Sequence, residues 1–495
     1  MSGAGGGGGG DGRVSTRRIP ALVVIVLMLV GGGAIDRWTR SSSDTVPDDS
    51  RTVIALAGPI AAPASARSSA FYCTGSTGAP DAVADGTVVI ANAGARPLRA
   101  DITVIPIAGN PGQLTLEVAA NGRVALRLAD VAQGDHLSAV VELDGGEAVV
   151  ELTTTGPLGT SVSPCASSAS PTWYFAEGVT TRDATEVLLV LNPFPEDAVV
   201  DFAFTTEEGQ VTPQALTGLA VRGRGMAAIN VGEYVQRREA VATQITARTG
   251  RLVVSRLQVF DGSVGRKGVS VTLGIPSPGP VWFFADGLAG DGLAERFQVY
   301  NPSQSEAQVE LAIDLDDGEA EPLRITVPRE SRVSVVANDE TRIPKGVGHA
   351  VTVRSTNGVD VVVERSIDAA GAAGRSGVGS SPGARAEARR WVFAAGQADA
   401  SLDEFLAVAN PGPTMAQVSV AVLADGVRQE IPGLRNLELA AGGRTVVRLA
   451  DHVPVPAAAL SLLVTSTQPV VVERLLFAQG GALGMAITPG IALRD

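Results

Sequence analysis

The stretch Trp173-Tyr174-Phe175-Ala176-Glu177-Gly178 occurs three times in this chain, twice in altered form. It returns as Trp282-Phe283-Phe284-Ala285-Asp286-Gly287 and as Trp391-Val392-Phe393-Ala394-Ala395-Gly396, each copy 109 residues after the one before. Internal similarity at a fixed period is the sequence signature of a repeat protein. The chain is therefore predicted to consist of tandem units.

Two further landmarks keep the same spacing of 109 residues. An apolar run ending in Asn-Pro follows each tryptophan motif, and a β-branched run ending in arginine closes each unit, which selects Asn192, Asn301, Asn410, Arg256, Arg365 and Arg474. The stretch from Phe71 to Ser170 is a fourth, diverged copy, because Gly122–Asp130 matches Gly443–Asp451. This copy lacks the tryptophan and has Asn92-Ala93 in place of Asn-Pro. The predicted repeats span 71–170, 171–279, 280–388 and 389–495.

Within each unit the apolar residues alternate with polar ones, as in Val309–Leu315, which is the period of a β-strand. Turn signals such as Asn357-Gly358 and Asp425-Gly426 separate the runs. About seven short strands in roughly 100 residues are typical of a two-sheet sandwich. A propeller is the alternative, but its blades need only about 40 to 50 residues. We predict an all-β fold of four tandem immunoglobulin-like β-sandwich repeats after one N-terminal transmembrane helix.

The amino terminus predicts a membrane anchor. Residues 1–18 form a glycine-rich tail with three arginines, and residues 19–35 form an apolar run just long enough to cross a bilayer. The arginines place the tail in the cytoplasm and the rest of the chain outside. A cleaved signal peptide is the competing interpretation, with Ala62-Pro63-Ala64 as a distant cleavage site. Residues 36–70 are expected to form a disordered stalk.

Composition excludes several classes of function. A formal net charge of -13 and the lack of a basic cluster argue against nucleic acid as a partner. The glycine-rich stretch 287–292 precedes no helix, so no nucleotide site is expected. Three histidines, His136, His349 and His452, are too few and too scattered for a metal site. We therefore expect no metal and no cofactor.

The two cysteines, Cys73 and Cys165, both lie in the first repeat. Outside the membrane they are expected to form a disulfide. Closing a loop of about 93 residues would stabilise this repeat by roughly 4 to 5 kcal/mol in the chain-entropy model.

A glutamate precedes each Asn-Pro by six residues and recurs with the same period. The predicted partners are the repeated arginines, which gives the ion pairs Glu186–Arg256, Glu295–Arg365 and Glu404–Arg474. A general acid or base in every unit is the functional alternative, but structural ion pairs perturb carboxylates equally well.

Motifs for catalysis fail on inspection, so no enzyme is predicted. Gly379–Gly383 fits the pattern of a nucleophile elbow but lies in a segment that reads as a linker. Glu177 and Asp286 could suggest a pair of acids for glycoside hydrolysis, but the last repeat has Ala395 there.

Through these tryptophan motifs and Asn-Pro strands, the chain from Phe71 to Gly490 resembles an uncharacterised family of exported, singly anchored actinobacterial proteins. The resemblance implies location and fold. The function that we expect is a non-catalytic envelope scaffold, whose stacked sandwiches project from the membrane and contact other envelope proteins. The alternative is a receptor for cell-wall glycan, with Trp173, Trp282 and Trp391 stacked on sugar rings. An envelope hydrolase is the weakest candidate.

Overall fold

A computed structural model describes Gly8 and residues 58–78, 82–316, 318–424, 426–454 and 457–494. The predicted tail, anchor helix and first part of the stalk, up to residue 57, lie outside the described residues, Gly8 apart. None of the helices among the described residues is long and apolar enough to cross a membrane. Everything below concerns the folded unit Ala55–Asp495.

The described residues of this unit are almost entirely β-strand, and short 3-10 turns are their only helical elements. Repeat 1 holds β2 (Ser69–Thr77), β3 (Asp85–Asn92), β4 (Leu98–Pro106), β5 (Gly112–Val118), β6 (Gly122–Arg127), β7 (His136–Leu143), β8 (Ala148–Gly156) and β9 (Gly159–Pro164). Repeat 2 holds β10 (Thr172–Phe175), β11 (Ala184–Asn192), β12 (Ala198–Thr206), β13 (Gly209–Val211), β14 (Thr217–Val221), β15 (Gly225–Asn230), β16 (Val241–Thr249), β17 (Val253–Asp261) and β18 (Lys267–Leu273).

The other two repeats continue the pattern. Repeat 3 holds β19 (Val281–Phe284), β20 (Leu293–Asn301), β21 (Ala307–Leu315), β22 (Gly318–Val327), β23 (Ser331–Val336), β24 (His349–Ser355), β25 (Val362–Ala370) and β26 (Ser376–Pro382). Repeat 4 holds β27 (Ala388–Ala398), β28 (Leu402–Ala409), β29 (Ala416–Ala424), β30 (Val427–Glu430), β31 (Leu437–Leu439), β32 (Arg444–Arg448), β33 (Ala457–Ala478), β34 (Met485–Pro489) and β35 (Ile491–Leu493). The predicted tandem β-sandwiches are thus confirmed.

Repeats 2 and 3 show the two sheets of the sandwich most simply. In repeat 2 an outer sheet runs β10-β16-β12-β13, with β14 also on β12, and an inner sheet runs β15-β11-β17-β18. Repeat 3 repeats this as β19-β24-β21-β22 and β23-β20-β25-β26. In the outer sheets buried and half-buried residues alternate, as along β21. The end of β11, in the inner sheet, is buried without alternation because both of its faces are covered.

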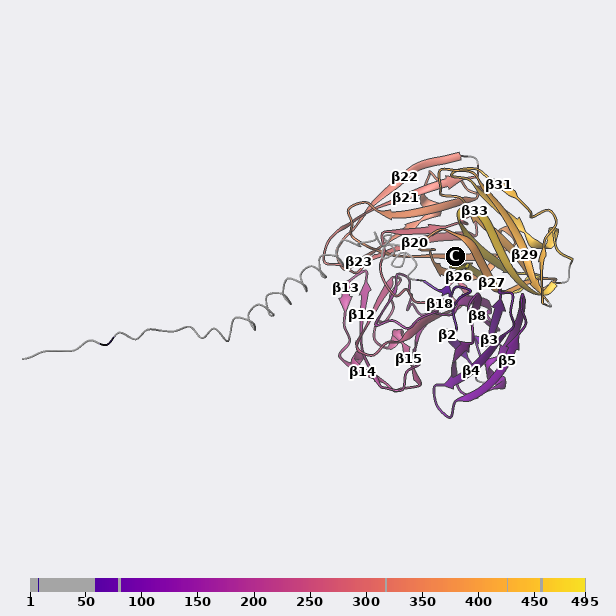
Figure 1. Cartoon of the computed structure of the whole chain (residues 1–495). Coiled ribbons are helices and arrows are strands. Elements are labelled where there is room, and N and C mark those ends of the chain that lie inside the picture. The colour runs from indigo at the N-terminus through magenta and orange to yellow at the C-terminus, as the bar shows by residue number, and fades with distance from the viewer. Residues whose placement is uncertain are drawn as a thin grey trace, which may run out of the picture. The chain divides into compact units, whose positions relative to one another are not determined.

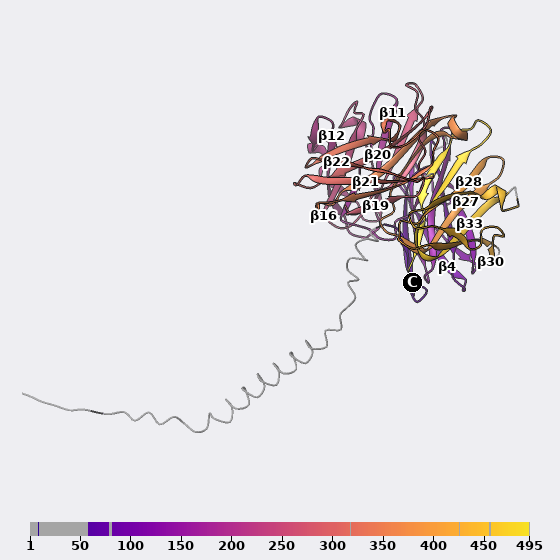
Figure 2. The same ribbon diagram turned by 90° about the horizontal axis from the view of Figure 1, so that it is seen from above.

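The four repeats form a closed ring rather than a linear stack. One edge strand from each repeat, β9, β18, β26 or β34, lies at the centre; these four strands contact one another in cyclic order, and β34 returns to β9. Figure 1 shows the repeats around this centre, from repeat 1 in indigo to repeat 4 in yellow. Figure 2 shows the folded unit from above, with strands of repeats 3 and 4 towards the viewer. The sequence analysis expected stacked sandwiches, and the structure corrects this arrangement to a ring.

Two short strands close the ring. β1 (Ile60–Ala61) pairs in parallel with β35, so the start of the folded unit joins the end of repeat 4. An apolar cluster with residues from repeats 1 and 4, including Val89, Val149 and Leu476, lies beneath this junction. Residues 58–70 were expected in a disordered stalk, but they are ordered because β1 finds a strand partner and an apolar cover.

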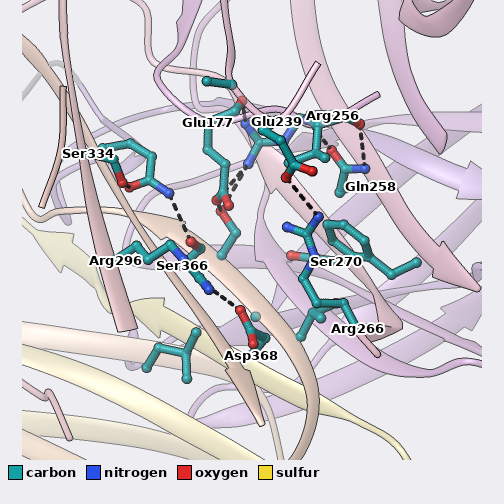
Figure 3. A pocket seen from close by; sticks show the side chains of 18 of the residues that line it. Glu177, Glu239, Arg256, Gln258, Arg266, Ser270, Arg296, Ser334, Ser366 and Asp368 are labelled. Carbon is teal, nitrogen blue, oxygen red and sulfur yellow. Dashed lines mark hydrogen bonds and ion pairs between the residues drawn. The ribbon is translucent and has the colours of Figure 1, made fainter. Parts of the chain in front are cut away.

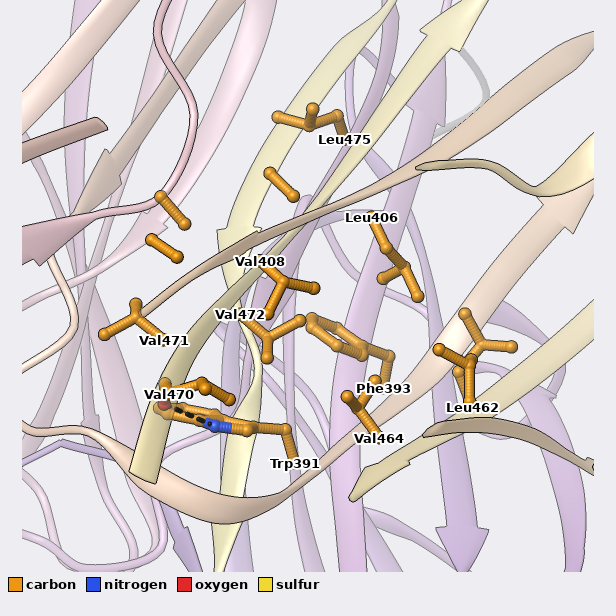
Figure 4. Packing of buried hydrophobic residues seen from close by; sticks show 14 of the residues in the cluster. Trp391, Phe393, Leu406, Val408, Leu462, Val464, Val470, Val471, Val472 and Leu475 are labelled. Carbon is orange, nitrogen blue, oxygen red and sulfur yellow. Dashed lines mark hydrogen bonds between the residues drawn. The ribbon is translucent and has the colours of Figure 1, made fainter. Parts of the chain in front are cut away.

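In repeats 2, 3 and 4 the apolar core surrounds the tryptophan motif. In repeat 4 Trp391 and Phe393 lie among Leu406, Val464 and Val472 (Figure 4). A buried aromatic ring of this size contributes several kcal/mol, since truncation to alanine typically costs about 3 to 5 kcal/mol.

Candidate functional site

The three repeated tryptophans are buried structural residues. Their exposed fractions are 2%, 0% and 4% for Trp173, Trp282 and Trp391. Each indole N–H donates to a backbone oxygen, that of Leu252, Val361 or Val470, at 2.9–3.0 Å. No face of the rings is open to a sugar, so the alternative function, in which these tryptophans stack on glycan, is not supported.

The repeated asparagines fasten the turn after each inner strand. The amide of Asn301 donates to the backbone oxygens of Ser305 and Val327, and its Oδ1 accepts the N–H of Ser303. Asn192 and Asn410 make equivalent bonds. Asn92 in repeat 1 does the same without a following proline. The asparagine, and not the Asn-Pro pair, is the structural feature.

The predicted disulfide Cys73–Cys165 is confirmed, with an S–S distance of 2.03 Å. In the other repeats a phenylalanine and a glycine occupy the positions of these two cysteines. In repeats 2, 3 and 4 the residue directly after β18, β26 or β34 is a glycine, which leaves space for the phenylalanine of the tryptophan motif. A Cβ on Gly274, Gly383 or Gly490 would lie 2.8 Å from the Cζ of Phe175, Phe284 or Phe393, respectively. Bridges at Tyr72–Ala166 and Tyr174–Ile275 place the two cysteines at these positions.

The repeated arginines pair with glutamates of the next repeat, and of the three predicted pairs only Glu295–Arg365 is present. Arg256 Nη2 lies 2.8 Å from Glu364, and Arg365 Nη2 lies 3.1 Å from Glu473. Arg474 Nη2 lies 2.9 Å from Glu151 of repeat 1. All six side chains are at most 1% exposed. The ion pairs therefore join neighbouring repeats and close the ring.

Each of these inter-repeat clasps has the same parts. The arginine also donates to a backbone oxygen of its own tryptophan motif, at Glu177, Asp286 or Ala395. The glutamate of the next repeat accepts a backbone N–H of that motif, from Ala176, Asp286 or Ala394. The contact between repeats 1 and 2 has no such pair, because Leu152 and Ser255 occupy the equivalent positions.

The glutamates predicted as partners lie inside their own repeats. Glu186 and Glu404 make no ion pair with Arg256 or Arg474 at 4.0 Å or less, since the arginines reach outward to the next repeat. Burial raises the pKa of Glu186 and of Glu404 to about 8. Glu295 lies 3.9 Å from Arg365, as predicted, and 2.9 Å from His349.

A polar cavity lies between repeats 2 and 3, and the clasp residue Arg256 is part of its lining. Its volume is about 540 Å³, and both repeats line it, with Glu177, Arg256 and Arg266 on one side and Arg296 and Asp368 on the other. Figure 3 shows these side chains pointing toward one another, with Arg296 bonded to Asp368 and Arg266 close to Glu239. A neighbouring hollow of about 620 Å³ shares Val264, Arg266 and Asp368 as lining.

The side of the cavity that repeat 3 supplies is more polar than the equivalent faces of repeats 2 and 4. Six positions on β20, β23 and β25 face repeat 2, and strand register identifies their equivalents in the other inner sheets. Repeat 3 has Arg296, Gln298, Arg332, Ser334, Ser366 and Asp368; repeat 2 has Val187, Leu189, Met226, Ala228, Leu257 and Val259; repeat 4 has Phe405, Ala407, Arg444, Val446, Leu475 and Phe477; and repeat 1 has Thr87, Val89, Arg123, Ala125, Thr153 and Thr155.

Arg332 is the cation of this cavity that no protein group satisfies. Arg266 lies 3.5 Å from Glu239, Arg296 is bonded to Asp368, and Arg256 belongs to the clasp. Arg332 Nε and Nη1 are buried without an acceptor in the described protein. Burial lowers the pKa of the Arg332 guanidinium, and the nearby charges of Glu177 and Glu364 oppose this effect.

The corresponding hollow between repeats 3 and 4 is smaller and internally paired. Its volume is about 350 Å³, and Phe405 and Phe477 form part of its lining. Arg444, the equivalent of Arg332, donates to Asp286, at 2.9 Å, and to Asp316. Of these two hollows, the one between repeats 2 and 3 offers the Arg332 guanidinium, which has no acceptor among the described residues, and neutral polar groups.

The glycine-serine segment, which the sequence predicts to be a linker, is instead a strand that lines this cavity. Ser376–Pro382 is the central strand β26, and Gly379 and Ser380 line the cavity. The hydroxyl of Ser380 donates to Glu177 Oε2 at 2.8 Å. Small residues are needed here because β26 packs against β18 and β34 at the centre of the ring.

Taken together, these features define a single-chain ring of four β-sandwiches joined by buried ion pairs, with a polar cavity at one joint. The chain belongs to the Family of unknown function (DUF5719), whose model matches residues 147–322 and 281–490. These residues include repeats 2 to 4 almost entire. Comparison with curated proteins gives no match.

Similarity to solved structures is limited. The Anabaena sensory rhodopsin transducer is 26% identical over 18% of this chain and 88% of its own, with a TM-score of 0.16. A Thermotoga maritima protein, 1070, is 18% identical over 22% of this chain and 94% of its own, with a TM-score of 0.20. A tetra-tandem repeat from the extending region of a large adhesion protein is 14% identical over 79% and 91%, with a TM-score of 0.11. These values carry no functional argument.

Proposed function

We propose that this chain is a non-catalytic interaction protein of the cell envelope, held at the membrane by residues 19–35 with its ring of sandwiches outside the cytoplasm. The observation that carries the proposal is the use of the recurring ionisable residues. The repeated arginines and their glutamate partners form buried ion pairs between repeats, and Arg365 and Glu473, for example, are fully buried. These ion pairs hold the ring of sandwiches together, so the repeated charges have a structural role.

Two sequence features support the proposed location. The arginines before the apolar run 19–35 favour a cytoplasmic amino terminus, as in the exported actinobacterial proteins that the chain resembles. A disulfide between Cys73 and Cys165 is typical of proteins outside the reducing cytoplasm. A ring that carries its own disulfide and many buried ion pairs suits an envelope protein that must stay folded without cytoplasmic chaperones.

Protease accessibility tests the location directly. The full chain with an epitope after Asp495 is produced in a bacterial host, and intact cells, spheroplasts and lysed cells are treated with protease. We expect the epitope in the membrane fraction, resistant to carbonate extraction and lost when protease reaches the outer side. An epitope that stays protected until the cells are lysed would contradict the proposal, as would recovery in the soluble fraction.

A further inference from the structure

The cavity between repeats 2 and 3 has the features of a binding site for a small solute. At this joint repeat 3 has charged, amide and hydroxyl side chains at the six positions where repeat 2 has only apolar ones. Apolar contact would stabilise this joint as it stabilises the joint between repeats 1 and 2. Polar groups there cost stability unless they are satisfied.

Among the described residues, Arg332 is the arginine of this cavity that has no acidic partner. Arg296 and Arg266 have acidic partners, while Arg332 has buried nitrogens that donate to no protein acceptor. The matched residue of repeat 4, Arg444, reaches two aspartates, so the position itself does not force an unpaired side chain. An unsatisfied buried guanidinium is complementary to a carboxylate or a phosphate, which it can bind through two parallel hydrogen bonds.

The groups beside Arg332 suit a hydroxylated molecule. Gln298 Nε2 donates to Ser366 Oγ at 3.1 Å, and Ser334 Oγ donates to Gln298 Oε1 at 3.4 Å, so these side chains form one row of donors and acceptors. Across the cavity Val179, Phe260 and Val378 form a small apolar wall. A pocket with an apolar wall and few placed polar groups is typical of small-molecule sites, and about 540 Å³ lies within their usual range.

We propose that this cavity binds a small hydroxylated organic anion, whose carboxylate or phosphate group pairs with Arg332 and whose hydroxyls meet Gln298, Ser334 and Ser366. This inference goes beyond the proposed envelope role and does not depend on the membrane location.

Four probes separate the parts of the proposal in calorimetric titrations of the full chain in detergent. Glucuronate and glucose 6-phosphate are sugars that carry a carboxylate and a phosphate, respectively. Glucose has the hydroxylated ring without an anionic group, and inorganic phosphate has the anionic group without the ring. We expect saturable binding of glucuronate or glucose 6-phosphate, the stronger of the two identifying the anionic group. Binding of glucose and of inorganic phosphate should be weaker by about tenfold or more, because each lacks one set of contacts.

The chain itself supplies the variants. Arg332→Met introduces the residue that repeat 2 has as Met226, and should weaken binding of the preferred anion about 10- to 100-fold, the effect of losing a charged hydrogen bond. The triple variant Gln298→Leu, Ser334→Ala and Ser366→Leu, also copied from repeat 2, should reduce the preference for the hydroxylated anion over inorganic phosphate.

Arg123→Met is the matched control, because Arg123 holds the equivalent position in repeat 1, and it should leave the affinity unchanged. Thermal unfolding of each variant shows whether it is folded. The proposal is overturned if neither sugar anion binds the wild-type chain, or if Arg332→Met binds as tightly as wild type. An equal loss of affinity in Arg123→Met would overturn it as well.

Discussion

Glu186 and Glu404 are carboxyl groups held neutral inside their repeats. Burial raises the pKa of each to about 8, from an ordinary value of 4.5, and the nearest arginines only partly offset this effect. Glu186 faces Arg256 and Arg332 as well as the acids Glu177 and Glu364, so its surroundings do not favour one charge strongly. A proton on the carboxyl is therefore part of the folded state at neutral pH.

These two carboxyls predict a loss of stability as the pH rises. The unfolded chain releases the proton near pH 4.5, whereas the folded chain keeps it up to about pH 8, so the unfolded state binds fewer protons in this window. Each carboxyl then lowers the free energy of unfolding by about 1.4 kcal/mol per pH unit between these values. Thermal unfolding from pH 5 to 9 should show a reduced pH slope in Glu186→Gln. A slope equal to that of wild type would contradict the assignment.

The disulfide and the phenylalanine–glycine pairs are two solutions for one place in the repeat. Replacing both Cys73 and Cys165 by serine should cost about 4 to 5 kcal/mol, because the bridge closes a loop with a sequence separation of 92. Cys73→Phe with Cys165→Gly copies Phe175 and Gly274, and should recover roughly 1.5 to 3 kcal/mol of that loss by burying an aromatic ring. Denaturant unfolding measures both differences. Equal stability of the two double variants would show that the positions are not equivalent.

At the scale of elements, the clasps explain why arginine recurs within β17, β25 and β33, and glutamate within β25, β33 and β8. The side chain of each arginine extends out of its own sandwich and forms an ion pair with the glutamate on the inner sheet of the next repeat. Buried pairs of this kind add little net stability over apolar residues, but losing one partner leaves a buried charge. An alternative without charges already exists between repeats 1 and 2, where Leu152 and Ser255 occupy the equivalent positions.

That alternative predicts the outcome of a pair of substitutions. Arg474→Leu should cost about 3 to 5 kcal/mol, since Glu151 remains buried without its partner. Adding Glu151→Ser turns the joint into a copy of the Leu152–Ser255 joint and should regain most of the loss. Denaturant unfolding of the single and double variants gives the coupling energy. If the double variant is as unstable as the sum of its two single variants, the clasp does not work as a unit.

The sequence predicts the strands, the repeats and the disulfide well, because these depend on local patterns: period-two alternation, a fixed spacing and the cysteine count. The partner of each arginine depends on how the repeats face one another. The sequence does contain a pattern that indicates the partner of each arginine. Arginine is missing in repeat 1, at Leu152, and glutamate is missing in repeat 2, at Ser255, so the pairs only match when each arginine reaches the following repeat and Arg474 returns to Glu151.

The candidate cavity is harder to predict from the sequence. Its polar residues lie on three separate strands, and each looks like an ordinary exposed residue of a half-buried strand. The signal is a comparison between repeats: Arg296 and Gln298 stand where repeat 2 has Val187 and Leu189. That comparison becomes meaningful only when the face is known to be covered by a neighbouring repeat, which requires the ring.

At the scale of the whole folded unit, the ring depends on a small junction between its two ends. β1 pairs with β35, and Ile491, Ala492 and Leu493 are at most 5% exposed. A stop codon after Gly490 removes this strand and uncovers the apolar cluster beneath it. We expect the truncated protein to be cleaved by protease faster than wild type, first between repeats 1 and 4. Unchanged resistance to proteolysis would mean that the junction does not hold the ring closed.

Small-angle X-ray scattering of the folded unit, from Ala55 to Asp495, tests the central claim that the four repeats close on one another. A closed ring predicts a compact particle, with a radius of gyration of about 22 Å for a chain of this length. Repeats arranged end to end would give a markedly larger radius and the scattering profile of a rod. The compact value would support the ring and the joint in which the cavity lies, and the rod-like profile would contradict both.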